Sequence, residues 1–476
     1  MPGREEVGGK VYVVGSVDRK KYARLLKDIG IFAVGSIGSK LILFLLLPLY
    51  TNVLTDVQFG IADLVVTIGQ LIMPFSSLVI FDAVLRFGIS KEEKCQNVLL
   101  NGLLVCCAGS VVVVLFTPLF GLYGPISEWR WFLSAYVILT MLNNVVMNYL
   151  KVKDRNRTYA FLSIFQTAVL ALANILLLCV WNAGICGYLL SLVISAGANL
   201  FVASFAGRIW EDLRASTFQR RLLLEMLCYS APLVLNNVSW WAIQSSEKVL
   251  IEAMLGASAL GAFTVASKMP ALINVIITIF SQAWGLSSVR EFEGSRDSRF
   301  FSMVLNCYQM IGFGASIALI AIIKPLMSLY VGEGFFDSWH LVPFLLASAS
   351  FSAISSYYGS LYGALKKSVN NMFSTLVAAI VNIIVSYFGI KLFGIWGAVF
   401  GTFAAYATLA IYRCKDVGRH IEINLDYRVF VCNIIILVAE SVLVSLDIMY
   451  MPVAIASLAL FFGNNWHMAK RMISGS

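Results

Sequence analysis

The stretch LTDVQFGIA at residues 54–62 recurs in modified form as LGASALGAF at residues 255–263, which places Gly60 on Gly261 at an offset of 201 residues. Three further pairs of segments follow in the same order along the chain, with offsets that grow slowly to 210. They are PLFGLYG from Pro118 with PLMSLYVG from Pro325, ANILL around Asn174 with VNIIV around Asn382, and GICG from Gly184 with GIWG from Gly394. Each match is short, but four matches in register predict a duplicated unit.

The composition around these repeats is that of a membrane protein. Of the 476 residues, 59% are apolar and only 13% are charged, and the mean hydropathy is +0.83. A soluble protein is about half apolar and a quarter charged, so a soluble enzyme, a disordered chain and a secreted disulfide scaffold are excluded. A spanning helix needs roughly 20 apolar residues, and the sequence predicts fourteen. The predicted spans are 28–53, 60–89, 98–120, 130–150, 158–181, 184–206, 225–250, 259–284, 300–323, 339–361, 371–388, 394–412, 428–446 and 449–468.

The repeats group these spans into an all-α architecture of two six-helix lobes followed by two extra C-terminal helices. Because the first span of each copy starts on the same side, we expect the lobes to be related by a pseudo-two-fold axis along the membrane normal. The predicted divisions follow the charged connections. They are a basic cytoplasmic tail at 1–27, an N-lobe at 28–207, a cytoplasmic linker at 208–224, a C-lobe at 225–413 and the last two spans within 428–468.

Basic residues gather on one side of the predicted bundle. Most of the 35 lysine and arginine residues fall in the N-terminal tail, in the even-numbered connections and after the last span. Positive residues are retained on the cytoplasmic side, so we expect both termini in the cytoplasm. The net charge of +9 then reflects orientation, and no role with nucleic acid is expected. The charged tail has no cleavable signal, which makes the first span the expected uncleaved signal.

Few residues in the sequence suit metal binding, nucleotide binding or catalysis. The nine cysteines lie mostly inside spans without a CxxC pair, and there are only three histidines, so we expect no metal site. No phosphate-binding loop of the GxxxxGK[ST] type occurs. The sequence therefore predicts no cofactor, no direct use of ATP and no enzymatic residues.

Four prolines lie in the first two helices of the two copies: Pro48, Pro74, Pro232 and Pro270. A proline removes a backbone hydrogen bond and kinks a helix, which inside a membrane requires a neighbour or cavity water to satisfy the freed carbonyl. We expect these helices to form the moving wall of a central cavity. Proline is also common in membrane helices that do not move, and that alternative stays open.

Two lysines from different lobes fall deep in the membrane. Lys40 lies roughly 18 Å into the first span, and Lys268 lies roughly 14 Å from the outer edge of the eighth. A charged group at this depth needs a wet cavity or a partner. An anionic head group in a cavity would compensate both lysines, and the alternative is a structural pair with a buried carboxylate or carbonyl.

Other ionisable residues have simpler explanations beside the functional ones. Arg86 follows Asp82 by four residues, so the two can pair on one helix face or Arg86 can form an inner anion site. Lys248 precedes Glu252 by four residues, which suggests a pair at the rim, with an outer gate as the alternative.

Three further carboxylates remain as candidates for ion coupling together with Asp82. Glu247 stands beside Lys248 late in the seventh span. Asp63, three residues into the second span, is expected at the membrane interface, and Glu440 lies mid-span in the thirteenth.

Trp240 and Trp241 stand near mid-depth of the seventh span, whereas most other tryptophans lie at span ends. A deep aromatic ring in a cavity wall can stack on a sugar face. Packing or lipid contact is the competing interpretation.

Several longer stretches resemble the oligosaccharide and polysaccharide flippases, the Wzx-like translocases of the MATE-like (MOP) exporter superfamily. These stretches are LPLYTNVLTDVQFGIADLV, AVLRFGIS, SAPLVLNNVSWWAIQSSEKVLIEAMLGASALGAFTVASKMP and PLMSLYVGEGF. The resemblance spans roughly residues 25–470. It implies two six-helix bundles in a V, with a cavity lined by spans 1, 2, 7 and 8.

The resemblance also implies a function and site residues. It implies transfer of undecaprenyl-diphosphate-linked repeat units across the bacterial plasma membrane for O-antigen, capsule or exopolysaccharide synthesis. Arg86 matches an arginine common in the family, and Glu247 with Lys248 matches an acidic-basic pair. Lys40 and Lys268 match basic cavity residues, although lysine stands where arginine is frequent, which weakens a bidentate phosphate grip.

We therefore expect alternating access around a cationic central cavity, with the lipid-linked oligosaccharide and membrane lipids as partners and the polysaccharide polymerase and chain-length machinery as further candidates. The alternative is a MATE-type, cation-coupled exporter of small molecules, which would rely on cavity carboxylates rather than lysines.

Overall fold

The computed structural model describes residues 4–7, 10–13, 42–90, 93–293, 298–424 and 426–474. Helices dominate these residues, and two short antiparallel strands, β1 (Arg4–Val7) and β2 (Lys10–Val13), form a hairpin near the N-terminus. The predicted all-α membrane fold is confirmed. Eleven described helices are long and apolar enough to cross a membrane, or up to twelve if one bent pair is a single span. The count of fourteen is not confirmed.

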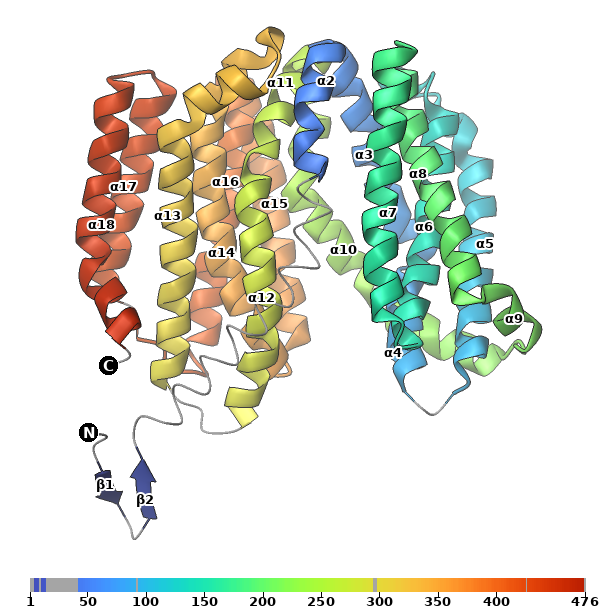
Figure 1. The fold of residues 1–476 in the computed structure, drawn as a ribbon, viewed down its shortest axis with the longest axis horizontal. Coiled ribbons are helices and arrows are strands. Elements are labelled where there is room, and N and C mark those ends of the chain that lie inside the picture. The colour runs from blue at the N-terminus through green and yellow to red at the C-terminus, as the bar shows by residue number, and fades with distance from the viewer. Residues whose placement is uncertain are drawn as a thin grey trace.

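The helices form two side-by-side groups, coloured blue to green and yellow to orange in Figure 1. The first group, here called the N-lobe, begins with the apolar helical segment Ile42–Val53, which ends as α2. Its elements are α2 (Leu47–Val53), α3 (Asp56–Ser77), α4 (Ile80–Ile89), α5 (Cys95–Phe120), η1 (Gly124–Ile126), α6 (Arg130–Val152), α7 (Asn156–Asn174), the π-helix η2 (Ile175–Val180), α8 (Gly184–Gly207) and α9 (Ile209–Arg214).

The second group, here called the C-lobe, is followed by two helices at its outer flank (Figure 1). The C-lobe elements are α10 (Arg220–Leu255), α11 (Ala257–Lys268), α12 (Pro270–Glu293), α13 (Ser298–Tyr330), η3 (Glu333–Leu341), α14 (Val342–Ala364), α15 (Ser368–Phe393) and α16 (Ile395–Val417), and the flanking pair is α17 (Tyr427–Ser445) and α18 (Tyr450–Ser474).

The second predicted span is not one helix. It is divided into α3 and α4 at Leu78 and Val79, which both have left-handed backbone angles (φ 49° and 53°). Pro74 removes one hydrogen-bond donor in the last turn of α3, and the Ser77 hydroxyl accepts a hydrogen bond from the Val79 amide at 3.2 Å. The proline therefore precedes a real break, which composition alone did not reveal.

The eighth predicted span is also broken. α11 and α12 meet at Met269 with a bend of 42°, and Pro270 is the first residue of α12. Proline suits the first turn of a helix because its missing N–H has no partner there in any case. The other two singled-out prolines are placed differently: Pro48 lies in the first turn of α2 and Pro232 lies within the continuous helix α10.

Helix α10 links the lobes, as Figure 1 shows. Its first turns pack on the N-lobe, where Leu222 and Met226 join a buried cluster with residues of α4, α5 and α6. Its later turns pack on α15 and α16, where Ile243 is buried with Ala378 and Leu409. The predicted linker at 208–224 stays a prediction, and the packing places the crossing between lobes further along the chain, near Pro232.

Equivalent glycines of the two copies both have a positive φ angle. Gly184, the first residue of α8, has φ +54°, and Gly394, just before α16, has φ +58°. These are the first residues of GICG and GIWG, the last pair of repeated segments. A left-handed backbone favours glycine, which explains why this residue occurs in both copies.

Candidate functional site

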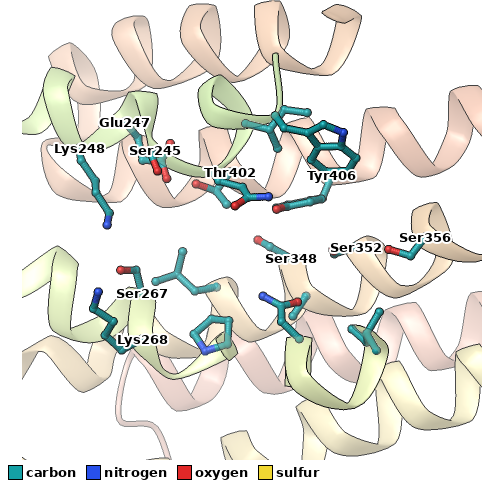
Figure 2. A pocket seen from close by; sticks show the side chains of 18 of the residues that line it. Ser245, Glu247, Lys248, Ser267, Lys268, Ser348, Ser352, Ser356, Thr402 and Tyr406 are labelled. Atoms are coloured by element: carbon teal, nitrogen blue, oxygen red, sulfur yellow. The ribbon is translucent and has the colours of Figure 1, made fainter. Parts of the chain in front are cut away.

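One candidate site is a cavity of about 470 Å³ in the C-lobe, shown in Figure 2. Helices α10, α11, α12, α14 and α16 line it, and ten of its twenty lining residues carry a hydroxyl or amide group. Its size falls within the range typical of small-molecule sites. We call it the polar cavity.

One end of the polar cavity holds an ion cluster that joins the two lobes. Asp63 of α3 is only 3% exposed and accepts hydrogen bonds from three residues of the C-lobe. Lys248 Nζ lies 2.7 Å from Asp63 Oδ2, Lys268 Nζ lies 3.2 Å from Oδ1, and the Thr264 hydroxyl lies 3.2 Å from Oδ2. We call Asp63, Lys248, Thr264 and Lys268 the ion cluster.

The ion cluster shows which partners Lys268 and Lys248 have, a question that the sequence left open. Lys268 pairs with a buried carboxylate, and Lys248 pairs with Asp63 rather than with Glu252, so the expected rim pair is wrong. Asp63 was expected at the membrane interface, and this depth stays a prediction; the structure adds that its side chain is buried where the two lobes meet. An i,i+4 pair can be read from the sequence, whereas a pair between helices of different lobes depends on their packing.

A second carboxylate stands beside the ion cluster. Glu247 is 3% exposed, lines the polar cavity and accepts a hydrogen bond from Asn382 Nδ2 at 3.1 Å. Two lysines and two carboxylates thus meet at this end of the cavity, although Asp63 itself does not line it. Their formal charges balance, so the predicted cationic character is not confirmed for the described residues. Lys40, the other expected cation, lies outside them.

A second cavity of about 370 Å³ adjoins the first. It lies between the lobes, with α2, α3, α7 and α8 on one side and α12 on the other, and most of its lining is aliphatic or aromatic. We call it the apolar cavity. Lys268 and Asn274 line both cavities. Lys268, whose side chain is 40% exposed, therefore lies where a polar space meets an apolar one.

The lobes also touch through two equivalent glycines. A Cβ atom on Gly60 of α3 would lie 2.2 Å from the Ala257 carbonyl oxygen, and one on Gly261 of α11 would lie 2.1 Å from the Asp56 carbonyl oxygen. The two contacts are related by the 201-residue offset of the repeats. We call these four residues the glycine contact. It lies at the upper end of the view in Figure 1, where α3 and α11 meet.

Further hydrogen bonds also join the two lobes. Tyr123, which follows α5, donates to Glu252 of α10, and its repeat equivalent Tyr330 donates to the backbone carbonyl of Phe44. The indole of Trp241 donates to the Thr67 carbonyl at 2.9 Å. The lobes are thus closed on each other at the end that the charge distribution predicts to be outside.

The other predicted site residues lie apart from these contacts. Arg86 is exposed on α4 and lines neither cavity, and no ion pair joins it to Asp82 among the described residues. Glu440 is fully buried in α17, and its carboxylate oxygens have no hydrogen-bond partner among the described residues.

The two deep tryptophans have different surroundings. Trp240 lines the polar cavity, whereas Trp241 makes the bond between the lobes. The guanidinium carbon of Arg413 lies 5.7 Å from the centre of the Trp240 ring, a cation–π distance. Arg413 is 2% exposed and donates to Ser355, Asn371, Ser374 and Thr375. Arg413 was not among the predicted site residues.

A row of serines in α14 was also missed. Ser348, Ser352 and Ser356 line the polar cavity and lie on one face of the helix, as Figure 2 shows. Their spacing of four residues was visible in the sequence, and it is the signal that could have found them. Serine is common in membrane helices, so spacing alone does not separate a cavity wall from helix packing.

Comparisons with known proteins agree with this arrangement. Residues 25–285, more than half of the chain, match the family model described as polysaccharide biosynthesis protein. No curated protein sequence matches significantly. Among solved structures, the lipid II flippase MurJ in an inward closed conformation has 11% identity and a TM-score of 0.68, covering 93% of this chain and 99% of its own.

Two MATE transporter structures share the fold at similar identity. A point mutant of the Vibrio cholerae MATE transporter VcmN has 14% identity and a TM-score of 0.59, covering 85% of this chain and 99% of its own. The eukaryotic MATE transporter AtDTX14 has 13% identity and a TM-score of 0.58, with coverages of 93% and 99%. The chain therefore belongs to the polysaccharide biosynthesis protein family, with the fold of the MOP superfamily of membrane transporters.

Proposed function

We propose that this protein is a flippase that moves undecaprenyl-diphosphate-linked oligosaccharide repeat units across the bacterial plasma membrane. The units would serve synthesis of O-antigen, capsule or exopolysaccharide. Membership of the polysaccharide biosynthesis family supports this function, and so does a fold shared with a lipid flippase.

The observation that carries the proposal is the position of Lys268 between the two cavities. A lipid-linked oligosaccharide has a polar glycan and an apolar tail joined by phosphates. The polar cavity fits the glycan, the apolar cavity fits the start of the tail, and the ammonium of Lys268 lies where the phosphates would be. Hydrocarbon in an apolar space and phosphate beside a cation are both stabilised.

The ion cluster supports a specific way for substrate to bind. Asp63 holds Lys248 at 2.7 Å, with the lysine side chain 11% exposed, and holds Lys268 at 3.2 Å, with that side chain 40% exposed. The phosphate of an incoming lipid would compete with Asp63 for Lys268, the longer and more exposed contact. Losing that contact weakens the link between α3 and the C-lobe, which favours separation of the lobes at the glycine contact.

The cycle that follows is alternating access. The polar head enters from the cytoplasmic side while the lobes are closed outside, and opening of the glycine contact then exposes it to the outside. The tail beyond the apolar cavity stays in lipid throughout. In this proposal both termini are cytoplasmic, the protein catalyses no covalent reaction, and the polysaccharide polymerase and chain-length machinery receive the product.

The experiment is deletion of the gene in its host, followed by analysis of the lipid-linked intermediates with a probe that cannot cross the membrane. The expected result is a carrier lipid that is loaded with glycan but no longer accessible from outside, with accessibility restored by the intact protein. Normal outward exposure in the deletion strain would refute the proposal.

A cation-coupled exporter of small molecules is the second candidate function. The buried carboxylate of Glu247 in the polar cavity favours it, because a cationic substrate needs such a partner. The two functions make opposite predictions for two variants. A flippase loses transport when Lys268→Gln removes the phosphate partner, whereas an exporter of cations keeps transport in Lys268→Gln and loses it in Glu247→Gln.

A further inference from the structure

Helix α14 presents two hydroxyl groups to the polar cavity from an otherwise buried surface. Between Leu345 and Tyr358 every residue of α14 is buried except Ser352 and Ser356, and both line the polar cavity. Their partial exposure is therefore exposure to that cavity. The third serine of the row, Ser348, is 2% exposed and bonds back to the Phe344 carbonyl at 2.9 Å.

Aromatic rings stand at the same end of the cavity. Tyr406 of α16 faces α14 across the cavity in Figure 2, and its hydroxyl and that of Ser352 both belong to the cavity lining. A hydroxyl oxygen has two lone pairs and one proton, so both groups retain hydrogen-bonding capacity. The Trp240 ring lines the cavity too and is held beside the guanidinium of Arg413.

Charge is confined to the opposite end. The three charged residues in the cavity lining are Glu247, Lys248 and Lys268, and Figure 2 places them away from Ser356 and Tyr406. The cavity thus has an ionic end and a neutral end of hydroxyls and rings. A sugar residue matches the neutral end, because its edges carry hydroxyl groups and its ring faces are apolar. Drug-sized apolar ligands instead favour mostly hydrophobic linings.

We infer that the neutral end of the polar cavity is a glycan-binding subsite, in which Ser352, Ser356 and Tyr406 hydrogen-bond sugar hydroxyls and Trp240 contacts a sugar face. This inference rests on the proposed function and adds a direction to it. The phosphates lie at Lys268, and the glycan extends from there along α14. Ser348 and Ser356 are separated by about two helical turns, or roughly 12 Å along the helix axis. The row of serines is therefore long enough to contact a short segment of glycan.

The test measures binding of two lipids to the purified full-length protein. One probe is the host's own lipid-linked repeat unit, isolated from the deletion strain, and the other is undecaprenyl diphosphate without sugar. The variants are Ser352→Ala, Ser356→Ala and the double variant. Ser355→Ala is the matched control, because this buried serine on the same helix does not line the cavity and its hydroxyl donates to the Ser352 carbonyl.

We expect each single variant to weaken binding of the glycosylated lipid about 5-fold and the double variant about 30-fold, as expected for the loss of one and two neutral hydrogen bonds. Binding of the bare carrier should stay unchanged in all three, and the control should bind both lipids as the wild type does.

Two outcomes would overturn the inference. The first is a double variant that binds both lipids as the wild type does, or that loses the same fraction of its affinity for both. The serines are then structural and the subsite is wrong, while the proposed function stands. If the wild type binds neither lipid, the proposed function fails, and the subsite fails with it.

Discussion

The glycine contact yields the sharpest prediction about the transport cycle. Gly261→Ala places a Cβ atom about 2.1 Å from the Asp56 carbonyl oxygen, and that atom belongs to backbone that cannot turn aside. Ordinary Cβ contacts begin near 3.4 Å, so α3 and α11 must separate before the variant fits. Overpacking of this kind costs about 1–3 kcal/mol.

In the proposed cycle this cost falls on the closed state alone, because α3 and α11 part when the lobes open outward. A difference of 1–3 kcal/mol shifts the balance between closed and open lobes by about 5- to 150-fold. Gly60→Ala should act similarly, since its Cβ would lie 2.2 Å from the Ala257 carbonyl oxygen. This equivalence follows from the repeat.

The assay is labelling of a buried reporter from outside. Thr264 is fully buried beside Asp63, so Thr264→Cys in a chain without its nine native cysteines reports opening to a maleimide that cannot cross the membrane. Labelling should accelerate about 5- to 150-fold when either glycine variant is added. Gly363→Ala is the control, because its Cβ would meet nothing within 4 Å. Equal labelling rates in Gly261→Ala and the control would refute the gating role.

Three further predictions concern the ion cluster and the bonds around it. Asp63→Asn leaves Lys248 buried without a charged partner and should lower the free energy of unfolding in detergent by about 3 kcal/mol. The double variant Asp63→Asn, Lys248→Gln should recover part of this loss. If the losses of the two single variants simply add in the double variant, the pairing is contradicted. Lys268→Gln should abolish outward exposure of lipid-linked repeat units in cells, whereas Lys268→Arg should retain it because guanidinium binds phosphate with two parallel bonds; equal activity of the two variants would argue against phosphate at this position. Trp241→Phe removes the bond to Thr67 and should raise labelling of the Thr264→Cys reporter about 5-fold, with an unchanged rate as the contrary result.

The helical architecture could be predicted from the sequence because apolar length and repetition determine it. The paired segments around Gly60 and Gly261 indicated a duplication, and the same two residues form reciprocal contacts between the lobes. The breaks at Leu78 and at Met269 could not be placed in advance. Proline marked both regions. Whether a proline bends a helix, begins it or lies within a continuous helix depends on which neighbours hydrogen-bond the backbone carbonyl that it leaves free.

The candidate site could be predicted only in part. Depth along a helix is readable from the sequence, and it singled out Lys268. The direction in which a side chain points depends on how the helix is rotated in the bundle, so the partners of Asp63 and Lys248 could not be known. Ser352 and Ser356 were missed for the same reason, since only packing reveals that the stretch of α14 around them is otherwise buried.

Reconstitution of the purified protein into sealed liposomes tests the central claim most directly. The host's lipid-linked repeat unit is placed in both leaflets, and the fraction accessible to a glycan-oxidising reagent that cannot cross the membrane is followed over time. The account predicts that the protected inner pool becomes accessible with the wild type and stays protected with Lys268→Gln. A protected pool that persists with active, correctly folded wild type would contradict it.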